Sequence, residues 1–225
     1  MKCAEILERM ESAANPANVA GMARYGITAK KVYGMSIPAL KKWAKEIGND
    51  HALAQQLWAT EILEARILAG LVDEPDRVSE RQMERWAKDF DSWAVCDCTC
   101  LNLFRETPFV HRKCREWSSR PEEFVKRGGF TLMACLAVHD KGSRDGTFLA
   151  FLPLIQREAV DERNFVKKAV NWALRQIGKR NRRLNRAAIK TAEAIQRLDF
   201  RSARWIATDA LRELKSQAVQ RRLKG

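Results

Sequence analysis

The sequence predicts an all-α protein, and three observations support this. Apolar residues recur in several segments at the i, i+3, i+4, i+7 spacing of a helix with one buried face. Alternating polar and apolar runs, which are typical of strands, are almost absent. Short stretches with Gly, Pro or Asn separate the helical segments, so we expect about a dozen helices.

The helical spacing is clearest in four segments taken in chain order. The apolar positions run from Leu40 to Ile47, from Met83 to Phe90, from Phe148 to Ile155 and, with one polar member, from Ala188 to Ile195. The expected breaks between helices are Asn15-Pro16, Gly34–Pro38, Glu74-Pro75, Arg120-Pro121, Lys141–Ser143 and Gly178.

A repeat of helix pairs is indicated by the spacing of the tryptophans. Trp43-Ala44 and Trp86-Ala87 are 43 residues apart, and Trp172-Ala173 follows after twice that step, with Gly129 at the intermediate position. A period near 43 is typical of HEAT and armadillo repeats, which stack into a superhelical α-α solenoid. No Pro/Gly-rich linker interrupts the chain, so we expect a single domain over residues 1–225.

The positive charge is concentrated near the C-terminus. The net charge is +13, and residues 161–225 hold eighteen Lys/Arg against six Asp/Glu. Between residues 163 and 190 there are ten basic residues and no acidic one. Such asymmetry favours a polyanionic partner, with nucleic acid ahead of an anionic membrane surface; the alternative is a solvated helical surface.

Other compositional features exclude several classes. No apolar run is long enough to cross a membrane and the first ten residues do not resemble a signal peptide, so we expect a cytoplasmic protein. The six cysteines lack Cys-x-x-Cys spacing and nearby paired histidines. We therefore expect reduced, buried thiols, with no metal and no cofactor.

The segment DSWAVCDCTC, residues 91–100, combines carboxylates, an indole and thiols. Ser92 suits the N-cap of a helix, but Asp97 lies too deep in that helix to cap it. Its helical neighbours, including Trp93 one turn earlier, are apolar. Such a carboxylate either forms a salt bridge with a neighbouring helix or faces a cleft. Cys96 and Cys100 share a face without further ligands and suit a core.

A second candidate lies on the helix expected over residues 164–179. Lys168, Trp172, Arg175 and Lys179 share one face of it, opposite an apolar stripe. An indole among cations suits a phosphodiester backbone, although an interhelix Trp covered by Lys and Arg stems is the alternative. Arg182 and Arg183 follow at a helix junction and suit a second phosphate clamp.

Together these residues resemble a known family. Ser92–Asp97, followed by Lys168 and then by Asn171–Arg175, resembles the HEAT-like-repeat alkylpurine DNA glycosylases, the AlkD family. Tyr25 and the segment Tyr33–Pro38, which includes Ser36, resemble that family's N-terminal Tyr and its Gly-x-x-x-Pro loop. Arg127 matches the place of its mid-chain phosphate-binding Arg.

The resemblance implies a monofunctional DNA glycosylase that removes N3- and N7-alkylated purines from double-stranded DNA without flipping the base and needs no cofactor. It implies catalytic roles for Asp97, Trp93 and Trp172. It implies DNA binding by Tyr25, Ser36, Arg127, Lys168 and Arg175, to which the basic helix face and the junction after it add Lys179, Arg182 and Arg183. A solenoid that wraps DNA needs no partner subunit, so we expect a monomer. Ser92 and Ala94 stand where family members often carry Trp and Asp. The alternative is a non-catalytic scaffold that binds nucleic acid or a protein partner.

Overall fold

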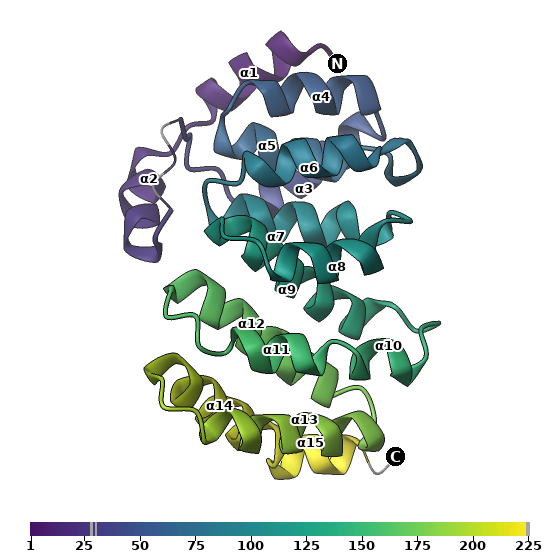
Figure 1. Cartoon of the computed structure of the whole chain (residues 1–225). Coiled ribbons are helices and arrows are strands. Elements are labelled where there is room, and N and C mark those ends of the chain that lie inside the picture. The colour runs from purple at the N-terminus through teal and green to yellow at the C-terminus, as the bar shows by residue number, and fades with distance from the viewer. Residues whose placement is uncertain (28, 30, 224–225) are drawn as a thin grey trace. The chain divides into compact units, whose positions relative to one another are not determined.

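The computed structural model describes residues 1–27, 29 and 31–223. Across these residues the chain forms fifteen α-helices and three short 3-10 helices, with no β-strand, which confirms the predicted all-α class (Figure 1). The chain divides into two compact units, residues 1–108 and 109–225. The single domain expected over residues 1–225 stays a prediction. No helix in the described part of the chain is long and apolar enough to cross a bilayer.

In its described residues, the first unit contains seven α-helices and three short 3-10 helices. Its α-helices are α1 (Cys3–Ser12), α2 (Pro16–Met22), α3 (Ile37–Ile47), α4 (His51–Ala59), α5 (Leu63–Val72), α6 (Glu80–Lys88) and α7 (Trp93–Asn102), and its 3-10 helices are η1 (Ala23–Tyr25), η2 (Pro75–Arg77) and η3 (Phe104–Glu106). Helix α5 packs against α3, α4 and α7. Helices α4 and α6 meet through Trp58 and Trp86, whose rings stack with centroids 3.9 Å apart.

Most helix starts in this unit follow from a capping side chain. Ser36, Asp50, Ser79 and Ser92 precede α3, α4, α6 and α7, and each accepts a hydrogen bond from the backbone N–H three residues later. These bonds satisfy N–H groups that have no partner within the helix. The predicted N-cap role of Ser92 is therefore confirmed.

The second unit contains α8 (Val110–Ser118), α9 (Glu123–His139), α10 (Asp145–Leu149), α11 (Leu152–Glu158), α12 (Asn164–Gly178), α13 (Arg182–Gln196), α14 (Arg201–Leu214) and α15 (Gln217–Arg222). Helix α9 packs between α8 and α12, and α14 packs against both α12 and α13. The core of this unit includes Phe130, Phe148 and Phe151, which are fully buried.

The pattern from Phe148 to Ile155 is not one helix. It divides into α10 and α11, which are separated by Ala150 and Phe151. Pro153 occupies the second position of α11. Its ring would clash with the carbonyl of Leu149 if the helix were continuous, and it has no N–H to donate. The apolar residues from Phe148 to Ile155 that form the pattern are nevertheless buried.

The tryptophans of the 43-residue step have different surroundings. Trp43 lies on α3, which packs against α5, whereas Trp86 lies on α6 and stacks on Trp58 of α4. Gly129, at the intermediate step, lies inside α9 where the backbone of α8 crosses closely. A Cβ atom there would be 2.7 Å from the amide nitrogen of Ser118, so the position has no room for an indole.

Candidate nucleic-acid interface

In the first unit a buried carboxylate shapes the loop before α3. Glu64 is fully buried and accepts hydrogen bonds from the backbone N–H groups of Tyr33, Gly34 and Met35, at 3.0, 2.7 and 3.2 Å. Gly34 has φ of 78°, and a Cβ atom there would lie 2.3 Å from the carbonyl oxygen of Asn15. Only glycine fits this turn. Glu64 therefore holds the predicted Gly-x-x-x-Pro loop in place.

Sequence reasoning did not find Glu64, although a signal for it exists. It is the only acidic residue in the helix LEARILAGLV, residues 63–72, where Arg66 is the only other charged residue. A carboxylate in such a position must find hydrogen-bond donors, because burial of an unsatisfied charge is costly. The signal indicates a structural acid, but it does not identify the loop that supplies the donors.

Trp93 and Tyr25 are joined in the same unit. The indole Nε1 of Trp93 donates to the backbone carbonyl of Tyr25 over 2.9 Å. Trp93 is half-buried at the first position of α7, while the Tyr25 side chain is 73% exposed at the end of η1. This bond fixes the plane of the indole and leaves the phenol open to solvent. Two residues predicted to contact DNA are thus neighbours.

A largely apolar cavity of about 530 Å³ lies beside them. From α7 it is lined by Trp93, Ala94 and Cys98, and Tyr25 and Ser36 line it from η1 and the loop before α3. The Ser36 hydroxyl oxygen accepts from the Ala39 N–H at the start of α3 over 3.4 Å. Its own O–H group is not needed for that cap and can donate elsewhere.

Asp97 is half-buried one turn after Trp93 and is not among the residues that line this cavity. It is adjacent to Cys98, whose thiol pKa is raised to about 11 by burial and by the Asp97 carboxylate. The Cys98 thiol therefore stays protonated at neutral pH and is a poor nucleophile.

The cysteines of this segment are free thiols. Cys96 and Cys100 are fully buried, which confirms their predicted place in the core. In the portion of the chain that is described, no group of three or more His, Cys, Asp or Glu side chains is arranged to hold a metal ion.

In the second unit α12 separates an apolar face from a polar one. Val166, Val170, Ala173 and Ile177 are fully buried, which confirms the predicted apolar stripe. On the opposite face Lys168 is exposed and Trp172 is half-buried.

Helices α12 and α14 are joined by contacts at a constant offset of 38 residues. The ammonium of Lys167 lies 5.7 Å from the centroid of the Trp205 ring. One turn later Asn171 donates to Asp209 over 2.7 Å, and after another turn Arg175 pairs with Glu213. A constant offset over successive turns means that the two helices run parallel and in register.

This row of contacts changes the electrostatics expected for α12. Glu213 also pairs with Lys179 over 2.5 Å, and Asp209 lies 3.5 Å from Arg175. Burial acts to raise the pKa of Glu213, but hydrogen bonds from Lys179 and Arg175 outweigh it and hold the pKa below its usual value. Arg175 and Lys179 are therefore compensated by α14. Lys168, one turn before Trp172, forms no ion pair with any described residue.

Of the other predicted contacts, Arg127 is the most buried. Arg127 is only 7% exposed, and its Nη1 donates a hydrogen bond to the backbone carbonyl of Phe165 over 2.6 Å. It therefore supports the start of α12. Arg182 and Arg183 are exposed at the first turn of α13, where Arg182 donates to the carbonyl of Leu223 over 2.9 Å. The Arg183 guanidinium lies 3.9 Å from Asp145.

Comparison with known proteins identifies relatives of the whole chain. The family model described as "DNA alkylation repair enzyme" matches residues 6–214. A solved structure matches with a TM-score of 0.79 and 18% sequence identity, and the match covers 99% of this chain and 96% of the chain in that structure. It is described as "A new family of proteins related to the HEAT-like repeat DNA glycosylases with affinity for branched DNA structures". The HEAT-like fold is therefore confirmed. No curated protein matches the sequence.

Proposed function

Because the chain belongs to the DNA alkylation repair enzyme family, we propose that it is a monofunctional glycosylase for cationic N3- and N7-alkylated purines in double-stranded DNA. It hydrolyses the bond between the base and the sugar and leaves the base unflipped. The observation that carries the proposal is the pair Trp93 and Asp97, one turn apart at the start of α7. The bond from Trp93 to Tyr25 holds the indole in place before any substrate binds.

The chemistry needs little from the protein. A purine alkylated at N3 or N7 is cationic, so the bond electrons can pass to the ring as the base leaves neutral, without a general acid. The sugar then carries oxocarbenium-like positive charge. The Asp97 carboxylate stabilises this charge and accepts a proton from the water that adds to C1′. The products are the free base and an abasic site, and the proton passes on to solvent.

The aromatic residues have a supporting role in this scheme. Indole faces attract the positively polarised sugar and base, which is the role we assign to Trp93 and Trp172. Tyr25, with its exposed phenol, and Ser36, with its free O–H, would contact the backbone from the first unit. Lys168, Arg182 and Arg183 are the exposed cations that we assign to phosphates in the second unit. Arg127, Arg175 and Lys179 remain proposed contacts that must give up protein partners to reach DNA.

Lys168→Ala is expected to flatten the salt dependence of DNA binding. An exposed lysine on a phosphate releases about one counterion, so the slope of log affinity against log salt should fall by about one unit. The measurement is fluorescence anisotropy of a labelled duplex over a range of NaCl concentrations. An unchanged slope would remove Lys168 from the DNA contacts.

Glu213→Gln is expected to act in the opposite direction. Removing this charge leaves Lys179 without its acidic partner and Arg175 with Asp209 alone, so duplex affinity at low salt should rise by roughly fivefold and the slope should steepen by up to about two units. Glu193→Gln is the matched control, since Glu193 pairs with Lys215 between α13 and α14. If Glu213→Gln behaves like the control, Arg175 and Lys179 do not meet DNA.

A second candidate function is binding of branched DNA without excision. Two observations favour it. Ser92 is fully buried as a helix cap, and Ala94 is a small apolar residue in the cavity wall, so neither supplies the aromatic and acidic groups often found at these places in the family. The solved relative is described as having affinity for branched DNA structures.

The two candidates are separated by product analysis. Methylated duplex DNA is incubated with the protein, and the supernatant is analysed for free 3-methyladenine and 7-methylguanine. The glycosylase proposal predicts release of free base and alkali-labile abasic sites in an otherwise intact strand. Tight binding of a four-way junction with no base released would favour the binding protein.

A further inference from the structure

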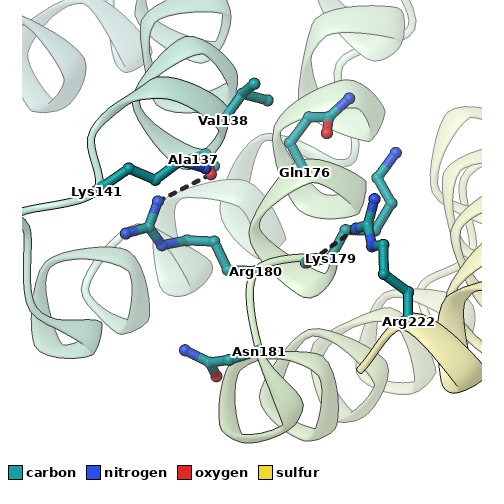
Figure 2. Close-up of a pocket in the computed structure, with 8 residues that line it drawn as sticks. All are labelled: Ala137, Val138, Lys141, Gln176, Lys179, Arg180, Asn181 and Arg222. Atoms are coloured by element: carbon teal, nitrogen blue, oxygen red, sulfur yellow. Dashed lines mark hydrogen bonds between the residues drawn. The ribbon is translucent and has the colours of Figure 1, made fainter. Parts of the chain in front are cut away.

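A second cavity, of about 410 Å³, lies in the second unit, where α9 and α12 end and α13 begins (Figure 2). Four of the side chains that line it are cationic and none is acidic. They are Lys141, Lys179, Arg180 and Arg222. The cavity lies beyond the residues to which the proposed function assigns a role, except that it shares Lys179.

The two arginines are held in place by backbone carbonyls. Arg180 donates from Nη1 to the carbonyl of Ala137 over 2.9 Å and stacks 4.1 Å from the centroid of Phe148. Arg222 donates from Nη2 to the carbonyl of Lys179 over 2.8 Å. Figure 2 shows both bonds as dashed lines on opposite sides of the cavity. Arg180 also donates to the carbonyls of Leu136 and Ser143 over 3.5 Å each. Each guanidinium has five N–H groups, so donors remain after these bonds.

The charge in the cavity exceeds what the protein supplies to balance it. The C-terminal ends of α9 and α12 each contribute about half a negative charge. Glu213 compensates Lys179 from outside the lining. Against four cations this leaves roughly two positive charges. Lys141 is exposed, and its ammonium has no hydrogen-bond or ion-pair partner among the described residues.

The cavity is continuous with the polar face of α12. Gln176 lies one turn after Trp172 and lines the cavity together with Lys179. Lys168 and Lys179 are about 16 Å apart along the helix axis, which corresponds to about five nucleotide steps of one DNA strand. A strand that contacts Lys168 and Trp172 can therefore reach the cavity.

We propose that this cavity binds a phosphate group, with Lys141, Arg180 and Arg222 as its cationic donors and Gln176 as a neutral one. Guanidinium groups match the geometry of phosphate oxygens, and fixed ones lose little freedom when they bind. The phosphate comes either from the backbone of a DNA strand or from a strand end. The inference rests on the nucleic-acid binding of the proposed function, and it is independent of base excision.

The first test uses inorganic phosphate and the full-length protein. Isothermal titration at constant ionic strength should detect phosphate binding, and Lys141→Ala should weaken it at least fivefold. Lys190→Ala is the matched control, because Lys190 is exposed on α13 outside the cavity. It should leave phosphate affinity unchanged. The proposal is overturned if wild-type protein binds no phosphate or if both variants weaken it equally.

The second test identifies the source of the phosphate. Duplexes with a 5′-phosphate and with a 5′-hydroxyl are compared for wild type and Lys141→Ala. Equal weakening of both duplexes supports a backbone phosphate, and weakening of the phosphorylated duplex alone supports a strand end. No weakening of either beyond the Lys190→Ala control contradicts a nucleic-acid phosphate. A protein that binds phosphate here but excises no base would refute the glycosylase and leave this site standing.

Discussion

Asp97→Asn is expected to lower the rate of alkylpurine release by at least about 100-fold. The amide keeps the shape of the side chain, but it carries no negative charge to stabilise the oxocarbenium-like sugar and accepts no proton from water. A 100-fold loss corresponds to about 2.7 kcal/mol of transition-state stabilisation. The measurement is the single-turnover rate of 7-methylguanine release at saturating protein. Duplex affinity should change little, because the contribution of Asp97 arises in the transition state.

Asp91→Asn is the matched control for this experiment. Asp91 lies six residues earlier, so the same Asp-to-Asn change can be made there; its exposed carboxylate lies 3.4 Å from the guanidinium of the buried Arg66. This variant should excise at the wild-type rate. If Asp97→Asn retains full activity, or if both variants lose activity equally, Asp97 is not the stabilising carboxylate.

Gly129→Ala is expected to destabilise the protein by about 3 kcal/mol. The new Cβ atom would lie 2.7 Å from the Ser118 amide nitrogen and 3.0 Å from the Trp117 carbonyl carbon, both of which are backbone atoms that cannot rotate away. Helices α8 and α9 would have to separate, and overpacking of this kind costs 1–3 kcal/mol or somewhat more. Thermal or urea unfolding followed by circular dichroism measures the change.

Gly146→Ala provides the comparison for that change. Gly146 lies in α10, and a Cβ atom there meets no heavy atom within 4 Å. The substitution should stabilise the helix by about 0.5–1 kcal/mol, because alanine loses less backbone freedom on folding. Destabilisation by both substitutions to a similar extent would show that the close approach of α8 to α9 is not what requires glycine at 129.

The helices could be predicted because the spacing of apolar residues along the chain marks the buried face of each helix. The apolar stripe from Val166 to Ile177 and the N-cap Ser92 could be predicted because each depends only on residues within one helix or one turn. The predictions from spacing that did not hold also have physical reasons. The apolar spacing from Phe148 to Ile155 is unbroken, but it does not reveal that Pro153 lacks the N–H group that a continuous helix needs. The 43-residue tryptophan step joins α3, which packs against α5, to α6, whose Trp86 stacks on α4.

The candidate site was harder to predict, because its key contacts are long-range. A helical wheel places Arg175 and Lys179 on an exposed basic face, yet both pair with Glu213 of α14. The 38-residue offset that joins Asn171 to Asp209 and Arg175 to Glu213 is visible in the sequence only once the parallel packing is known. Glu64 is similar, since its loop partners are about thirty residues away.

The most direct test of the central proposal is wild-type excision from a duplex with a single 7-methylguanine. The protein is in excess, and free base is quantified against time and against spontaneous loss from the same duplex. We expect release well above the spontaneous rate, in one phase, with an abasic site and no strand break. Release at the spontaneous rate from a duplex that the protein demonstrably binds would contradict it.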